Sequence, residues 1–524
     1  MPSRGNRHVD RRAFLKYLAA SGSTAAIAGC MGGGGSGGSG GGNGSGGASS
    51  DFASEVGKLD FGSNWKKRRM ATLEEWPYEK RKQIPTDGKG AAATTAKAWL
   101  DSESVKSSTW TPPEGWKDTA ASEVDKIQVL NYGDMQFDPA TAALDAMFEA
   151  KTGIAVERLQ IVVDQAIPKM AATLSSKKGT PHLLQSTTDT SMTTYAQNGW
   201  LEPTDFLMPN EEMWEPLIPL ARNTFNWNDH LWGAPGNNEG MPVHVRVDLL
   251  KEQGVSQGVV DRIAGGKSTW DDLETVMKAF EGTDVFGWSY RGSSLTYTER
   301  DFRVHWYQTG GQYVQDDGTV KVNGPGAQLA LSKMIEWKDK GWVPDGVTTY
   351  TQGDLADGFL AGQFAMVPVA TDLFADAAAK YKLNEQYVLA PPFKGTDGPA
   401  PARHTWGGGP VLATNKFAPT PEKVAGALLQ DARYSLEAGW WEYVVESNMA
   451  YPKAAFEQAT QTDAVPFSKV RQRTMEVAKN EVFPQQRAIM QRVSEELQVA
   501  LAGDKSAKKA LDDAQNFVDT VLGR

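Results

Sequence analysis

Cysteine is almost absent from this chain, which has one, Cys30, in 524 residues. A single thiol cannot form an internal disulfide, so the folded part must be stabilised by buried apolar side chains. Long hydrophobic runs are also scarce near the N-terminus. The stretch over residues 17–28 is apolar but too short, and too rich in small residues, to span a bilayer. These absences exclude a disulfide framework and a transmembrane helix at this position.

The chain also lacks an excess of positive charge and the common catalytic motifs. Its net charge of -10 argues against a nucleic-acid partner. No dinucleotide-binding G-x-G-x-x-G, P-loop, H-E-x-x-H or G-x-S-x-G motif occurs, and no cysteine–histidine pair is arranged as a nucleophile. We therefore expect a protein that is not an enzyme and needs no cofactor and no metal.

What the N-terminus does contain has the order of an export signal. Asp10, a pair of arginines and Phe14-Leu15-Lys16 precede the short apolar run. The twin arginine resembles a Tat signal, and residues 28–30 (AGC) resemble a lipobox, in which the cysteine sulfur is lipidated. We predict a signal peptide over residues 1–29, lipidation of Cys30, and a protein anchored by lipid at the extracellular face of the cell membrane.

Glycine and serine dominate the residues that follow. Residues 30–50 have too few side chains to repay the entropy of folding, so we predict a flexible tether. Residues 51–124 contain several tryptophans but no clear periodicity, and we expect an irregular, partly helical extension that lies on the folded body. The remaining length is too large for one hydrophobic core and indicates two domains.

A regular pattern begins near residue 125. Residues 127–132 predict a buried strand, and Asp138-Pro139 predict the start of a helix that ends at Gly153. A second strand is expected over residues 154–159. Strand, helix and strand in this order indicate a parallel sheet and an α/β fold.

Eight segments in order resemble the extracellular solute-binding proteins of ABC transporters, family 1, of the maltose-binding type. They are residues 148–156 (FEAKTGIAV), 195–203 (YAQNGWLEP), 230–235 (HLWGAP), 248–255 (DLLKEQGV), 269–273 (TWDDL), 362–366 (GQFAM), 390–395 (APPFKG) and the helix over 507–521. The resemblance covers about residues 125–524 and does not extend to residues 51–124.

The resemblance implies a two-lobe periplasmic-binding-protein fold with hinge strands between the lobes. Lobe I would comprise residues 125–237 and 404–449, and lobe II residues 238–403 and 450–524. The ligand would lie in the cleft between the lobes. The resemblance further implies a monomer that delivers its ligand to an ABC permease in the membrane.

Sugar hydroxyls need planar donors and acceptors, and sugar C–H patches lie on aromatic rings. The candidates for such contacts lie after predicted strands, near the predicted hinge, or early in lobe II. They are Tyr132, Asp134, Asp189, Asn237, Asn238, Glu239, Trp288, Tyr290, Trp406 and Gly407. The resemblance implies hydroxyl-binding roles for Asp189 and Glu239. Trp406 would offer a ring face, with the glycines after it letting the backbone approach a ligand. Trp288 and Tyr290 fit a core position equally well.

Two other protein classes remain as alternatives. A secreted glycoside hydrolase needs two carboxyl groups about 5 to 9 Å apart, and no spacing in the sequence singles out such a pair. A structural surface protein would show internal repeats, which do not appear. The prediction is therefore a binding protein for a sugar or oligosaccharide, with a polyol, polyamine or phosphodiester as the alternative ligand.

Overall fold

The computed structural model describes residues 50–69, 110–132, 139–161, 163–187, 191–236, 239–293, 295–370, 373–444, 448–462 and 465–524. The predicted signal peptide, Cys30 and nearly all of the predicted tether lie outside these ranges. None of the helices within them is long and apolar enough to cross a membrane.

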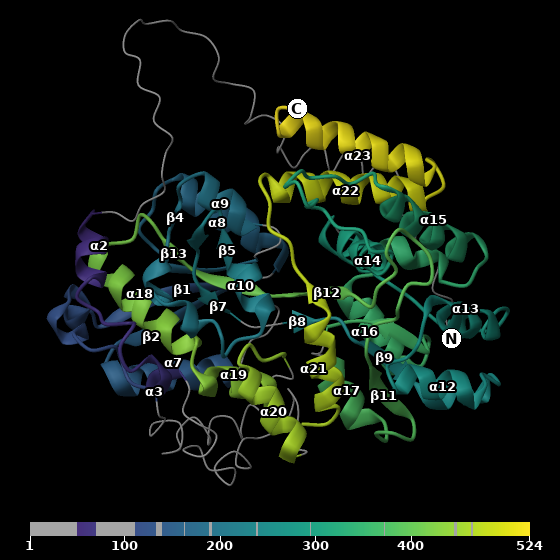
Figure 1. Ribbon diagram of the computed structural model, residues 1–524, viewed down its shortest axis with the longest axis horizontal. Coiled ribbons are helices and arrows are strands. Elements are labelled where there is room, and N and C mark those ends of the chain that lie inside the picture. The colour runs from purple at the N-terminus through teal and green to yellow at the C-terminus, as the bar shows by residue number, and fades with distance from the viewer. Residues whose placement is uncertain are drawn as a thin grey trace, which may run out of the picture. The chain divides into compact units, whose positions relative to one another are not determined.

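A six-stranded sheet forms the centre of the first of two large cores (Figure 1). Its strands are β1 (Lys126–Tyr132), β2 (Ala155–Ile161), β3 (Leu183–Thr187), β4 (Leu201–Glu202), β7 (Ala234–Pro235) and β13 (Pro410–Asn415). The strand β1 runs parallel to β2 and β3, whereas β13 pairs antiparallel with β3, β4 and β7. Around the sheet pack α7 (Pro139–Thr152), α8 (Val163–Ser175) and α18 (Thr420–Arg433).

The strand–helix–strand unit predicted from the sequence is confirmed as β1, α7 and β2. Ile127, Val129 and Leu130 of β1 are buried, which explains why this apolar stretch forms a strand inside the sheet. The helix α7 ends at Gly153, whose φ of 79° is the left-handed conformation that glycine adopts without strain.

The described parts of the N-terminal extension pack on this first core. Phe52 of α2 (Ser50–Val56) and Trp110 are fully buried in it. Arg68 of α3 (Trp65–Arg69) forms a buried ion pair with Asp431 of α18, at 3.3 Å, and the Trp110 Nε1–H donates to the same carboxylate at 3.0 Å. The buried carboxylate of Asp431 is thus held by both Arg68 and Trp110, and these contacts fix the extension to α18.

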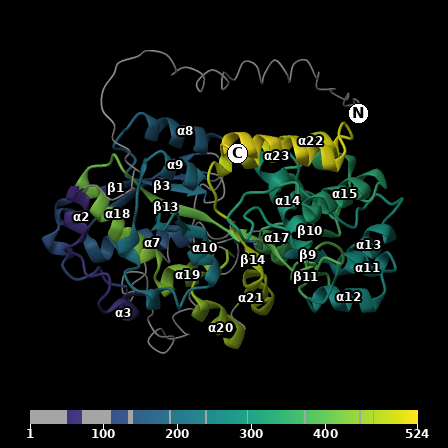
Figure 2. The same ribbon diagram turned by 45° about the horizontal axis from the view of Figure 1, so that its top comes forward.

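The second core surrounds a three-stranded antiparallel sheet in the order β10-β9-β11. Its strands are β9 (Val243–Arg246), β10 (Met366–Pro368) and β11 (Tyr387–Ala390). Its helices include α11 (Val247–Glu252), α12 (Gln257–Ala264), α13 (Trp270–Ala279), α14 (Leu295–Gln308), α15 (Pro325–Asp339), α16 (Gln352–Ala361), α17 (Leu373–Lys380), α22 (Gln486–Leu501) and α23 (Ala507–Val521). The last two helices lie side by side, and α22 covers α14 (Figure 2).

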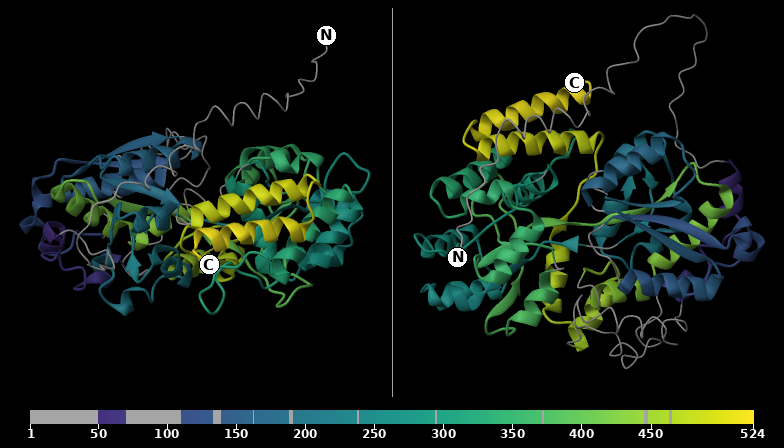
Figure 3. Two further views of the ribbon diagram at one scale, coloured as in Figure 1. Left: turned by 90° about the horizontal axis from the view of Figure 1, so that it is seen from above. Right: turned by 180° about the vertical axis from the view of Figure 1, so that it is seen from behind.

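Three short strands connect the two cores: β8 (Glu239–Gly240), β12 (Thr405–Gly408) and β14 (Ala478–Lys479), in the order β14-β12-β8. The segment between α21 (Ser468–Glu476) and α22 contains β14 (Figure 3). The sequence prediction placed the third crossing at the boundary between residues 449 and 450, where lobe I would pass into lobe II. The third crossing instead lies at β14, because α20 (Lys453–Thr462) packs in the first core with the Phe456 ring 4.9 Å from that of Tyr443.

Candidate functional site

The predicted glycine-rich run lies where the crossing strands meet. Gly407 and Gly408 of β12 pair with Gly240 and Glu239 of β8. A Cβ atom on Gly407 would lie 2.6 Å from the Cβ of Ala478, and Gly408 has a φ of +153°. The glycines are therefore needed to bring β8, β12 and the third crossing together. Close packing of protein strands thus accounts for this run without a ligand.

Trp406 points from β12 into a small buried cluster with Met241 and Val304. Its side chain is 2% exposed. The guanidinium carbon of Arg300, on α14, lies 3.9 Å from the centroid of the indole ring. This is a close cation–π contact, and it covers one face of the ring that the sequence predicts to be open to ligand. Because only 2% of the side chain is exposed, neither ring face is open for a ligand to stack on.

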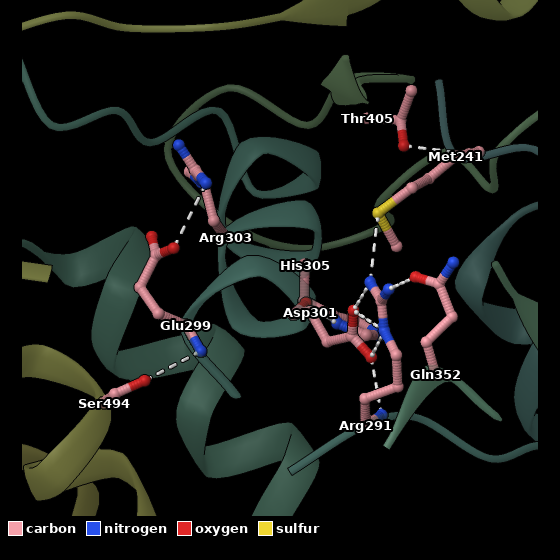
Figure 4. Close-up of polar contacts among 9 residues, drawn as sticks. All are labelled: Met241, Arg291, Glu299, Asp301, Arg303, His305, Gln352, Thr405 and Ser494. Atoms are coloured by element: carbon pink, nitrogen blue, oxygen red, sulfur yellow. Dashed lines mark hydrogen bonds and ion pairs between the residues drawn. The ribbon is translucent and has the colours of Figure 1, made fainter. Parts of the chain in front are cut away.

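Beside this cluster lies a fully buried ion pair between Arg291 and Asp301 (Figure 4). Asp301 also accepts the backbone N–H of Arg291 at 2.6 Å, and the guanidinium donates to Gln352 Oε1 at 2.8 Å. A second Arg291 nitrogen lies 3.4 Å from the sulfur of Met241, the residue that follows β8. The network thus connects α14 and α16 of the second core to the crossing strands.

A second buried ion pair joins two residues that are one turn apart on α14. Arg303 and Glu299 are both 0% exposed, with 3.1 Å between Nη2 and Oε2. The hydroxyl of Tyr313 donates to Glu299 at 2.7 Å, and the Glu299 backbone N–H donates to Ser494 of α22 at 3.2 Å. Because the two charges pair with each other and Glu299 also accepts from Tyr313, α14 is held in one position. Its Arg300 is thereby fixed against the crossing strands.

Trp288 and Tyr290 occupy the second core. Both are almost completely buried, and both pack edge-on against His305, with ring centroids 6.3 and 6.5 Å away. Burial and the nearby charge of Asp301 raise the pKa of Tyr290, and burial lowers the pKa of His305. These positions match the core alternative that the sequence left open.

The structure describes only some of the other predicted ligand residues. Tyr132 ends β1, where its backbone pairs with Ile161, and Glu239 is half-buried on β8. Outside the described residues lie Asp134, Asp189, Asn237 and Asn238, as does Cys30. Among the described candidates, the fold brings Glu239, Trp406 and Gly407 together at the crossing strands. Their role in ligand binding stays a prediction.

The sequence prediction did not include the buried charges of α14. Residues 299–303 read Glu-Arg-Asp-Phe-Arg, with charges on every side of a helix that also carries Phe302 and Trp306. A helix patterned in this way cannot keep all of its charges in water while burying its aromatic rings. This conflict was the available signal for a buried polar network. Within the described ranges, no three His, Cys, Asp or Glu side chains are grouped to hold a metal ion.

Comparison with known proteins identifies the class. Residues 143–434 match the family described as bacterial extracellular solute-binding protein. This match spans more than half of the chain, so the protein belongs to that family, whose members function in the extracellular or periplasmic space. The relatives found are binding proteins rather than enzymes.

Individual relatives are distant. A binding protein of Brucella abortus (strain 2308) is 23% identical over 219 residues, which are 41% of this chain and 49% of that protein. The chain thus spans about half the length of the curated relatives it matches.

Solved structures resemble the chain over a longer stretch. Maltose-bound MalE3 of T. maritima matches with a TM-score of 0.63 and 19% identity, covering 76% of this chain and 99% of that one. An ABC-transporter solute-binding protein of Thermotoga lettingae bound to α-D-tagatose has a TM-score of 0.64 and 19% identity, covering 76% and 100%. These likenesses confirm the predicted periplasmic-binding-protein fold.

Proposed function

We propose that this protein is the substrate-binding component of an ABC importer and captures a sugar or oligosaccharide between its two cores. The observation that carries the proposal is the family match over residues 143–434, together with two α/β cores joined by three short strands. A ligand that contacts both cores only when they approach each other stabilises the closed arrangement. The closed protein then delivers its ligand to a membrane permease.

The proposed binding surface is the cleft side of the crossing strands. Glu239 would accept hydrogen bonds from ligand hydroxyls, since a carboxylate is a strong acceptor. Trp406, which is 2% exposed and lies 3.9 Å from the guanidinium carbon of Arg300, would support the site from beneath. Tyr132, Asp134, Asp189, Asn237 and Asn238 would complete the hydrogen bonds, and Gly407 would contribute backbone.

Sugars are the favoured ligand class because the similar solved structures contain them: maltose in one and α-D-tagatose in the other. Polyols, polyamines and phosphodiesters are the alternatives. We further propose that the chain is exported by the Tat route, is anchored through a lipid on Cys30 and acts as a monomer at the extracellular face.

A thermal-shift screen followed by calorimetric titration tests the function. The panel would contain maltose, maltotriose, α-D-tagatose, ribitol, spermidine and glycerophosphocholine. A ligand at about 100 times its dissociation constant should stabilise the folded protein by about 2.7 kcal/mol. Stoichiometric binding of a sugar without turnover supports the proposal. Release of shortened products would indicate a hydrolase, and a shift only with ribitol, spermidine or the phosphodiester would replace the sugar by that ligand.

A further inference from the structure

A cavity lies on the crossing segment, next to the strand β12 that carries Trp406 and Gly407. It has a volume of about 410 Å³, within the range of small-molecule pockets. It shares no wall residue with the predicted sugar-contacting side chains. We propose that this cavity, named here the crossing pocket, binds a small organic anion with an apolar body.

The walls of the crossing pocket come from both cores. Leu220 of α10 (Pro219–Phe225) and Phe456 of α20 belong to the first core, and Gln312 follows α14 in the second. Met475 belongs to α21 and packs in the first core, and Lys479 belongs to the crossing strand β14. The apolar side chains Leu220, Phe456 and Met475 supply surface that an apolar ligand body would cover.

A half-buried positive charge in the pocket, that of Lys479, lacks a direct protein partner. Among the described residues, the Lys479 ammonium makes no ion pair or hydrogen bond, and its closest recorded contact is the Tyr307 ring, 5.9 Å from Nζ. This lysine is half-buried, and the removal of water around it lowers its pKa. An anion placed beside it would gain a charge-assisted hydrogen bond in a partly dry site.

The charge of Glu481 acts on Lys479 and opposes the lowering of its pKa, but the two side chains form no ion pair. Glu481 is occupied, because its carboxylate accepts the backbone N–H groups of Tyr313 and Val314, at 3.1 and 2.8 Å, and the Tyr307 hydroxyl at 2.8 Å. Glu476 pairs with Arg473 at 3.0 Å on the surface. Glu457 is exposed at the rim. The inner part of the pocket therefore presents an ammonium beside apolar carbon, which suits an amphiphilic anion.

Two dyes with the same rings provide the test. Anilinonaphthalene sulfonate carries an anion, whereas N-phenylnaphthylamine is its uncharged counterpart, and both fluoresce when they leave water. We expect the full chain to bind one equivalent of the sulfonate saturably and to prefer it to the neutral dye. Lys479→Met, which keeps the length of the side chain, should weaken sulfonate binding about 5- to 10-fold and leave the neutral dye unaffected.

Two further variants locate the dye. Asn223, an exposed wall residue on α10, can be replaced by tryptophan to fill the pocket without disturbing a core. Asn223→Trp should reduce sulfonate binding about tenfold or more. Lys382→Met removes an exposed lysine far from the pocket walls and should change nothing. Unaltered binding in Asn223→Trp, or equal losses in the two lysine variants, would overturn the proposal whether or not a sugar binds.

Discussion

Trp406 and Glu239 lie on neighbouring crossing strands, yet their surroundings give them different expected roles. Trp406 is 2% exposed and packs against Met241, Val304 and Arg300, whereas Glu239 is half-buried. Trp406→Ala should therefore lower the free energy of unfolding by about 3 to 5 kcal/mol even without ligand, because it empties a packed site. Glu239→Gln should leave the melting temperature nearly unchanged and weaken sugar binding about 5- to 30-fold.

Melting curves and calorimetric titration of the two variants with the sugar identified in the screen would distinguish these roles. A Trp406→Ala protein that melts like the parent would show that its ring is not part of the packing. A Glu239→Gln protein that binds the sugar as tightly as the parent would remove Glu239 from the proposed binding surface.

The proposed lipid on Cys30 would affect location rather than folding, since Cys30 precedes a glycine-rich stretch far in sequence from either core. Cys30→Ser should release the protein from membranes into the medium while leaving sugar affinity unchanged. Fractionation in high salt, which removes proteins held only by charge, is the appropriate measurement. A serine variant that still sediments with membranes would contradict lipid anchoring.

His244 predicts how stability depends on pH. It is fully buried on β9, 2.9 Å from the Tyr387 hydroxyl, and burial together with the charge of Arg471 lowers its pKa to about 3. Between pH 6.5 and 3 the unfolded chain therefore binds a proton here that the folded chain does not. Stability falls as the pH falls through this range, by about 1.4 kcal/mol per unit from this residue.

The variant His244→Gln should reduce that slope. Urea unfolding between pH 6.5 and 5, above the range where most carboxylates titrate, isolates the histidines. Burial also lowers the pKa of His182, His305 and His404, so the slope should become smaller without vanishing. An identical slope in the variant would mean that His244 is protonated alike in both states.

At the scale of elements, α14 depends on its buried ion pairs. Asp301→Asn leaves the Arg291 charge without its carboxylate in a site where both side chains are almost fully buried. We expect a loss of about 3 to 5 kcal/mol in the free energy of unfolding, measured by urea titration. The matched control is Glu211→Gln, which breaks the exposed pair with Arg222 and should cost less than about 1 kcal/mol. Equal losses would show that burial does not decide the outcome.

At the scale of the whole molecule, the proposed function requires the two cores to move. A saturating sugar should reduce the radius of gyration by on the order of an ångström, as hinge closure requires. Small-angle X-ray scattering with and without the sugar measures this change, and a non-binding sugar from the same panel serves as the control. An unchanged scattering curve at saturation would contradict closure.

The sequence predicted the fold better than the site for a physical reason. Apolar periodicity and terminal signals predicted β1 and α7, because these features act locally, whereas the C-terminal helix over 507–521 was expected from the family resemblance. The packing of α20 on the first core depends on Phe456 meeting Tyr443, which no local pattern reveals. Likewise the covering of Trp406 by Arg300 joins residues far apart in the sequence. The sequence could not decide between a core role and a ligand role for Trp288, because its contacts with His305 and Phe393 also join residues far apart in the sequence.

The position of β13 determines when the chain can fold. This strand lies between β3 and β4 in the first sheet, but it is synthesised only after residues 239–403, including the sheet of the second core, have been made. Until then β3 has an unpaired edge, which can pair wrongly with other chains. The first sheet therefore cannot be completed when β1 to β4 have just been synthesised, because β13 does not yet exist. Folding of the first core must wait until residue 415 is available, so the growing chain depends on protection of that edge until then.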